Sequence, residues 1–149
     1  MTALTLARPD DLDRLLPLVA AFHADQGIDR DDDARRRAAV LPLLEGSPHG
    51  AIYLAGPRRA PIGYLILSFG WSVKRGGLEG VIDQFFIRPG VRGRGIGSEI
   101  LNALPNALAG AGLKALHLEV ARNDARARAH CERMRFEPRE PYLRMTRLL

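Results

Sequence analysis

A glycine-rich stretch, Arg92-Gly93-Arg94-Gly95-Ile96-Gly97-Ser98, contains the residues of this chain best suited to bind a charged ligand. Three glycines within five residues let the backbone approach a ligand with no side chain in the way. The first N–H groups of a helix have no partner inside it and carry about half a positive charge. If a helix begins here, those N–H groups and the two arginines form a binding site for a diphosphate.

The residues on either side of this stretch predict the elements that would position it. An apolar run, Val81–Pro89, reads as a strand. Apolar residues after the glycines recur near the 3.6-residue period of a helix: Ile96, Ile100, Leu101, Leu104 and Leu108. We expect Pro105 to kink or split this helix. The sequence therefore predicts a strand, a glycine turn and a helix in succession.

Two other nucleotide-binding loops do not fit the stretch. A P-loop requires a lysine after its glycines, and none follows them here. A dinucleotide-binding fingerprint requires glycine where Ser98 stands and an acidic residue about 20 positions further on. Glu119 lies near that position, but the glycine spacing is wrong.

The spacing Arg92-x-x-Gly95-x-Gly97 resembles the acyl-CoA loop of the GNAT superfamily of N-acetyltransferases, whose pattern is Gln/Arg-x-x-Gly-x-Gly/Ala. The resemblance extends over nearly the whole chain. It implies a mixed α/β fold with a central, mostly antiparallel sheet that contains one splayed parallel strand pair, flanked by about four helices. We therefore expect residues 1–149 to form a single GNAT domain.

Composition is consistent with one globular domain and excludes several other classes. The chain has 149 residues, 46% of them hydrophobic, and no apolar run reaches the length of about 18 residues that a membrane span requires. A single cysteine, Cys131, excludes an internal disulfide and a cysteine-cluster metal site. The spacing of His23, His49 and His117 does not suit a metal either, and we read these histidines as structural. We expect a cytoplasmic protein without a metal.

The net charge of +5 suits a polyanionic partner, either nucleic acid or a phosphorylated cofactor. No nucleic-acid-binding motif is present, and aromatic residues do not alternate with basic ones as they do in single-strand binders. A basic nucleic-acid-binding domain is therefore the least favoured interpretation. A CoA-binding module without catalysis is a stronger alternative, because the usual base and tyrosine of the family are both absent.

The remaining elements are predicted from local patterns. Ala3–Ala7 reads as the first strand, and Asp10 as the cap of the helix that follows. The acidic segment Asp25–Asp33 is either a solvated turn or a rim that attracts a cationic amine. Lys114–Ala121 and Tyr142–Leu148 read as later strands.

The C-terminal part resembles a second block of the family, Asn-x-x-Ala-x-x-x-Tyr-Glu-x-x-Gly-Phe. Alignment on Phe136 places Asp124 at the asparagine and Cys131 at the tyrosine. A helix is expected to begin at Asn123 and Asp124. The resemblance also places these two residues beside the cofactor.

Acetyl-CoA is the cosubstrate that the resemblance implies, with a primary amine of a small molecule or protein as acceptor. The loop N–H groups would hold the pyrophosphate, and the edge of the preceding strand would pair with the pantetheine arm. The residues expected to contact the cofactor are Phe85, Phe86, Ile87, Arg92, Gly93, Arg94, Gly95, Ile96, Gly97, Ser98, Asn123 and Asp124. The family often forms homodimers, and neither a membrane nor a nucleic acid is expected as a partner.

Transfer to an amine requires removal of a proton, because only the neutral amine is a nucleophile. An alkyl amine whose ammonium form has a pKa of about 10 is neutral in only about one part in a thousand at pH 7. Glu79 and Asp83 can accept that proton or bind the ammonium group, and alternation along a strand places both on one face with Val81. The base position common in the family falls at Val81. Gln84 is a neutral amide and cannot act as a base.

Protonation of the departing CoA thiolate is the second proton transfer. Cys131 stands where family members often use a tyrosine acid. A small buried thiol beside Ala127 and Met134 also suits simple core packing. His130 points about 100° away around the helix, and solvent can protonate the thiolate without a protein acid.

Overall fold

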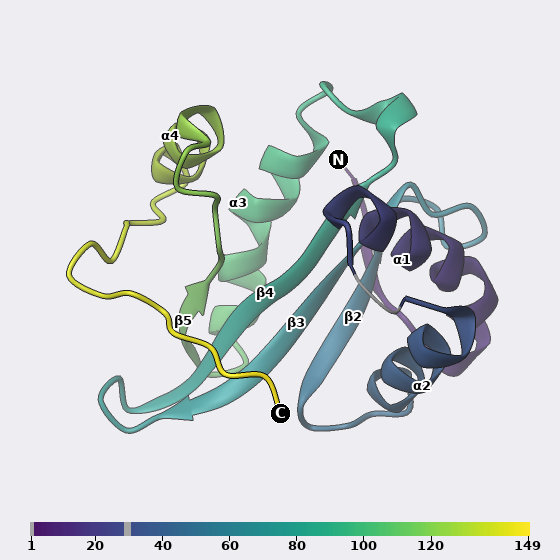
Figure 1. The fold of residues 1–149 in the computed structure, drawn as a ribbon, viewed down its shortest axis with the longest axis horizontal. Helices are drawn as coiled ribbons and strands as arrows, with labels where there is room; N and C mark the ends of the chain where they lie inside the picture. The colour runs from purple at the N-terminus through teal and green to yellow at the C-terminus, as the bar shows by residue number, and fades with distance from the viewer. Residues whose placement is uncertain (1, 29–30) are drawn as a thin grey trace. The chain divides into compact units, whose positions relative to one another are not determined.

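The computed structural model describes residues 2–28 and 31–149, which form two compact units. The unit Met1–Leu118 contains the whole β-sheet and helices α1, α2 and α3, and the unit Glu119–Leu149 contains helix α4 (Figure 1). The glycine-rich stretch and both candidate carboxylates therefore belong to the first unit.

A five-stranded sheet forms the centre of the first unit, with the strand order β1-β2-β3-β4-β5. Its strands are β1 (Leu4–Leu6), β2 (Gly50–Ala55), β3 (Gly63–Ser72), β4 (Gly77–Ile87) and β5 (Leu113–His117). All neighbouring strands are antiparallel except β4 and β5, which are parallel. This confirms the predicted mixed, mostly antiparallel sheet with one parallel pair.

Helices α1 (Leu12–Gln26) and α2 (Asp33–Leu44) pack on one face of the sheet (Figure 1). Their buried side chains form one cluster with side chains of β2, β3 and β4. The members of this cluster on β3 and β4 include Tyr64, Ile66 and Phe86. Because side chains alternate along a strand, these residues identify the face of the sheet that α1 and α2 cover.

Helix α3 (Ile96–Ala109) connects β4 to β5 and lies against the opposite face. It contributes four buried apolar residues, and the sheet contributes others that lie outside the α1 and α2 cluster. Those residues are Ile100, Leu101, Leu104 and Leu108 from α3, and Ala55, Leu65, Leu67 and Ile82 from the sheet. The helix runs without a break through Pro105, so the predicted split does not occur.

Two irregularities shape β4. The register between β3 and β4 shifts after the pair Ile66 and Gln84, so Asp83 stands at a bulge without a partner on β3. The parallel pairing with β5 begins at Leu78 and ends at Val81. Beyond Val81, β4 pairs with β3 alone, and its other edge has no partner strand among the residues that the structure describes.

Three local predictions are wrong. Asp10 does not cap α1, because a 3₁₀ turn, Pro9–Asp11, comes first and places Asp11 immediately before the helix. The strand predicted over Lys114–Ala121 is shorter, since β5 ends at His117 where its pairing with β4 ends. Tyr142–Leu148 forms no strand, because its unit contains no other strand in the described chain with which it could pair.

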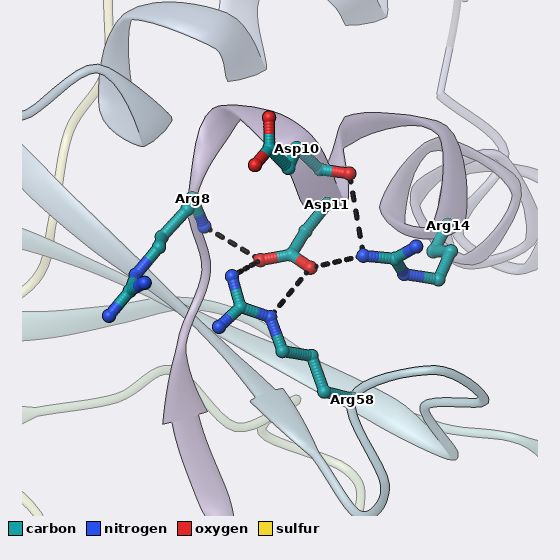
Figure 2. Close-up of polar contacts among 5 residues, drawn as sticks. All are labelled: Arg8, Asp10, Asp11, Arg14 and Arg58. Atoms are coloured by element: carbon teal, nitrogen blue, oxygen red, sulfur yellow. Dashed lines mark hydrogen bonds and ion pairs between the residues drawn. The ribbon is translucent and has the colours of Figure 1, made fainter.

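Asp11 is the only buried charged residue of the described chain and ties α1 to the sheet (Figure 2). The guanidinium of Arg58, in the turn between β2 and β3, donates to both carboxylate oxygens at 3.0 and 2.9 Å. Arg14 donates at 2.6 Å, and the backbone N–H of Arg8 at 2.9 Å. Burial alone would raise the pKa of Asp11, but these hydrogen bonds outweigh it and hold the pKa at about 2.

Candidate functional site

The glycine-rich stretch forms an open turn between β4 and α3. A 3₁₀ turn, Pro89–Val91, follows β4, and α3 begins immediately after Gly95. Gly93 and Gly95 have positive φ values of 79° and 76°, a conformation that only glycine adopts readily. A side chain at either position would meet no atom within 4 Å. The backbone of the turn is therefore accessible to a ligand.

Several backbone N–H groups in this turn have no backbone acceptor. The N–H group of Gly97 lies in the first turn of α3, where a helix offers it no partner. Within the described residues, no backbone carbonyl accepts from the N–H groups of Gly93, Arg94, Gly95, Ile96 or Gly97. This row of donors at a helix N-terminus fits the oxygens of a diphosphate.

The side chain of Arg92 folds back onto β4 and does not point into the turn. Its Nε donates to the carbonyl of Ile87 at 2.7 Å, and its guanidinium carbon lies 5.3 Å from the centroid of the Phe86 ring. It also lies 3.5 Å from the carboxylate of Asp25 at the end of α1. Arg92 thus braces the turn against the sheet, while Arg94 is exposed.

Phe85, Phe86 and Ile87 form the end of β4 that lacks a partner on the β5 side. The Phe85 ring lies beside the start of α3, where a side chain at Gly97 would approach it to 3.8 Å. Phe86 is buried against Phe22 and Tyr64, so its side chain belongs to the core. Only the backbone of Phe86 is placed to contact a ligand.

A surface beside the parallel strands lies on the same face of the sheet as α1 and α2. Tyr64 and Ile66 point to that face, and alternation along β3 places Ser68 and Gly70 there as well. Cross-strand pairing then adds Val81, Glu79 and His117. We call these residues the β4–β5 surface: Ser68, Gly70, Glu79, Val81 and His117. A side chain at Gly70 would meet nothing within 4 Å, so there is free space opposite Glu79.

A hydrogen-bonded pair, Glu79 and His117, occupies this surface. The Nε2 atom of His117 lies 2.6 Å from Oε2 of Glu79, and Arg75 donates to Oε1 at 3.1 Å. The hydrogen bond from His117 is the largest influence on the carboxyl group and holds the pKa of Glu79 below its usual value. Glu79 is consequently ionised at neutral pH. The sequence predicted Glu79 as a site residue but gave no signal that His117 would join it.

A series of hydrogen bonds links the sheet to α1 and to the residues that precede α2. The Tyr64 hydroxyl donates to Oε1 of Gln84 at 2.7 Å, and Nε2 of Gln84 lies 2.9 Å from Nε2 of His23. Nδ1 of His23 lies 2.8 Å from Asp31, which also pairs with Arg36. Burial raises the pKa of Tyr64, and the charges of Asp83 and Asp31 raise it further. These groups satisfy one another and connect β4 to the start of α2.

The other predicted site residues belong to other parts of the chain, and each is described within its own unit. Asp83 is exposed at the bulge, so it does not follow the simple alternation with Glu79 that an unbroken strand would give. In the second unit, the carboxylate of Asp124 caps α4 (Ala125–Arg133) by accepting from the N–H of Ala127 at 3.0 Å, and Asn123 precedes it. Cys131 is half-buried on α4, where burial raises the pKa of its thiol.

Neither a metal site nor a membrane-spanning helix is present in the described residues. They contain no group of three or more His, Cys, Asp or Glu side chains that could hold a metal ion. No helix among them is both long enough and apolar enough to cross a membrane.

Comparison with known proteins identifies the class to which this fold and turn belong. The family model of the acetyltransferase (GNAT) family matches residues 15–136. The chain therefore belongs to the GNAT family of acetyltransferases. No curated protein sequence gives a match.

Solved structures share the fold over almost the full length of the chain. An integron cassette protein from the mobile metagenome of Cole Harbour Salt Marsh is 29% identical, with a TM-score of 0.81, and the match covers 98% of this chain and 90% of that one. A putative acetyltransferase from Arthrobacter sp. FB24 is 28% identical, with a TM-score of 0.82 and coverage of 99% and 96%. A predicted acetyltransferase from Clostridium acetobutylicum, solved with acetyl-CoA, is 18% identical, with a TM-score of 0.76 and coverage of 98% and 96%.

Proposed function

We propose that this protein transfers the acetyl group of acetyl-CoA to a primary amine by direct attack of the amine in a ternary complex. The single observation that carries the proposal is the row of unpartnered backbone N–H groups from Gly93 to Gly97 at the start of α3. Family membership supports acetyl transfer, and the Clostridium acetobutylicum relative was solved with acetyl-CoA.

The cofactor would be held by the backbone more than by side chains. The N–H groups from Gly93 to Gly97 would bind the pyrophosphate, with Arg94 adding positive charge. The free edge of β4 at Phe85, Phe86 and Ile87 would pair with the amide-bearing pantetheine arm. Asn123 and Asp124 complete the proposed cofactor residues. When bound, acetyl-CoA supplies the thioester whose acetyl group is transferred.

The acceptor would bind beside the parallel strands. Glu79 on the β4–β5 surface and Asp83 at the bulge provide negative charge for an ammonium group. Holding the amine next to the thioester should account for much of the rate, because correct placement of two reactants is equivalent to a high local concentration. Asp83 and Glu79 therefore remain proposed catalytic or ammonium-binding residues.

We propose that the half-buried side chain of Cys131 on α4 has a packing role and is not a catalytic acid. Solvent would then protonate the CoA thiolate. The family match runs through the boundary between the two units, which supports one domain over residues 1–149. A chain with a free thiol as its sole cysteine suits a reducing compartment such as the cytoplasm. A homodimer is the proposed assembly.

Release of CoA from acetyl-CoA with a panel of amines would test the proposed reaction. The panel should include polyamines, amino acids, aminoglycosides and peptides with free N-termini, and product mass should show an added acetyl group. Turnover with at least one amine is expected. Tight binding of acetyl-CoA without turnover of any amine would instead favour a non-catalytic CoA-binding module.

A further inference from the structure

The Glu79 and His117 pair has the arrangement of a base and the group that orients it. Glu79 is ionised and carries no proton, so the 2.6 Å hydrogen bond requires Nε2 of His117 to carry one. In the neutral imidazole, the lone pair is then on Nδ1. Within the described part of the chain, Nδ1 of His117 has no hydrogen-bonding partner, and the side chain is 36% exposed. Nδ1 is therefore free to accept a proton.

His117 also stands where a substrate can reach it. It is the last residue of β5, and its pairing with Val81 is the last contact between the two parallel strands. Beyond this point no strand among the described residues pairs with that edge of β4. Small residues, Ser68 and Gly70, line the same face, and the space opposite Glu79 is empty. A ligand on the β4–β5 surface would thus lie against His117.

Glu79 is less suited to take the proton itself. Its two carboxylate oxygens already accept from His117 and Arg75, and its side chain is only 17% exposed. A carboxylate whose pKa lies below the ordinary value is also a weaker base than a free one. These contacts favour Glu79 as the residue that fixes the tautomer and orientation of the imidazole ring.

We propose that Nδ1 of His117 is the base that removes the proton from the acceptor ammonium, with Glu79 as its positioning residue. This assignment rests on the proposed acetyl transfer and deepens it. The proton moves from the ammonium nitrogen to Nδ1, and the amine lone pair then forms the C–N bond. The C–S bond breaks with its electrons on sulfur. The nitrogen then loses its second proton to solvent, and solvent protonates the CoA thiolate. The proton on His117 returns to solvent.

Kinetics of His117→Gln and Glu79→Gln with the best amine of the panel would test the assignment. The matched control is His49→Gln, which changes an exposed histidine whose side chain makes no contact in the described chain. At pH 7, His117→Gln should lower kcat about a hundredfold, within the range of general base catalysis. Acetyl-CoA affinity and the circular dichroism spectrum should be unchanged in all three variants.

The pH dependence separates a base from a merely structural residue. Charged groups contacting the pair from β4 and its hairpin are Glu79 and Arg75, and both keep their charge from pH 7 to 10. Near pH 10 about half of the amine is already the free base, so the deficit of His117→Gln should shrink to a few-fold. A loss that is the same at every pH would contradict the proposal, as would rates within twofold of the wild type at pH 7.

The double variant identifies which member of the pair is the base. If Glu79 acts through His117, Glu79→Gln should cost about tenfold, and adding it to His117→Gln should cost nothing further. If Glu79→Gln alone gives the larger loss, Glu79 is the base and the assignment is overturned. If the wild-type protein acetylates no amine, the proposed function itself is overturned. If the wild type acetylates an amine and His117→Gln does so equally fast, only the assignment of His117 is overturned.

Discussion

The Nη2 atom of Arg58 lies 2.9 Å from Oδ2 of Asp11, although the two residues are 47 positions apart in the chain (Figure 2). This contact joins the start of α1 to the turn between β2 and β3. Asp11 is fully buried, so removal of its carboxylate would leave two guanidinium groups facing a site without a counter-charge. The ion pair therefore holds a helix against the sheet that positions the candidate site.

Asp11→Ala should destabilise the protein by about 2 kcal/mol, because it removes a buried carboxylate that is hydrogen-bonded to two arginines, each about a third exposed. Urea unfolding followed by circular dichroism would measure this. The control is Asp10→Ala, an exposed neighbour whose carboxylate makes no hydrogen bond to Arg14 or Arg58 in the described chain, for which a change within about 0.5 kcal/mol is expected. Equal losses in the two variants would contradict the role given to Asp11.

The lowered pKa of Asp11 predicts how the free energy of unfolding changes in acid. Its folded-state pKa of about 2 lies below the unfolded value near 3.9. A lowered carboxyl pKa stabilises the fold fully above the unfolded pKa, and this stabilisation is lost as pH falls through the folded pKa. The free energy of unfolding of the wild type should therefore drop between pH 4 and pH 2 more steeply than that of Asp11→Ala. Parallel curves for the two proteins would contradict the assigned pKa.

Gly95→Ala should destabilise the fold although nothing crowds the position. The φ value of Gly95 is 76°, and a residue other than glycine in this region costs on the order of 1 kcal/mol. Gly90→Ala is the matched control, because Gly90 has neither a positive φ nor a neighbour within 4 Å of a new side chain. Thermal unfolding should show a lower Tm for Gly95→Ala alone. If both variants melt like the wild type, the turn does not need the left-handed conformation.

Tyr64→Phe should cost about 1 kcal/mol in the free energy of unfolding. The change removes a hydrogen bond of 2.7 Å and leaves Oε1 of Gln84 without its donor beneath α1. Tyr53→Phe is the control, since no hydrogen bond of the Tyr53 hydroxyl is present in the described chain. An unchanged midpoint of urea unfolding for Tyr64→Phe would show that the polar chain from Tyr64 to Asp31 adds nothing to stability.

Cys131→Ala should keep most of the acetyltransferase activity. Burial raises the pKa of this thiol, which suits packing on α4. Steady-state kcat with the best amine should fall by less than about threefold, whereas loss of a general acid typically costs a hundredfold or more. A thousandfold fall with the fold intact would instead assign Cys131 as the acid that protonates the CoA thiolate.

The glycine turn could be predicted from sequence because its features are local. Positive φ values and a helix start depend on residues adjacent in the chain, so Gly93, Gly95 and Gly97 were sufficient to indicate it. The parallel pair and the mixed sheet followed from the resemblance that these residues carry. The prediction that Asp10 caps α1 is wrong because it uses local patterns alone. The aspartate that is buried is Asp11, which pairs with the distant Arg58.

The partner of Glu79 could not be predicted, because it depends on non-local register. His117 is 38 residues away, and it meets Glu79 because the β4–β5 pairing shifts by one residue between Leu78 and Glu79. The bulge at Asp83 is equally hidden, since it results from the pairing of β4 with β3. The strand expected at Tyr142–Leu148 had a suitable composition, but composition does not supply the neighbouring strand that it requires.

Calorimetric titration of acetyl-CoA into Gly97→Asp and Gly97→Ala tests the central claim most directly. Alanine should fit, because its methyl group would contact Phe85 at an ordinary 3.8 Å. Aspartate should not harm the fold, because a negative charge stabilises the first turn of a helix. The same charge would repel a diphosphate bound to the N–H groups. A hundredfold loss of acetyl-CoA affinity requires only about 3 kcal/mol of repulsion. We predict that Gly97→Ala binds acetyl-CoA within a few-fold of the wild type and Gly97→Asp at least about a hundredfold more weakly. A folded Gly97→Asp variant with wild-type affinity would show that the cofactor does not bind at this turn.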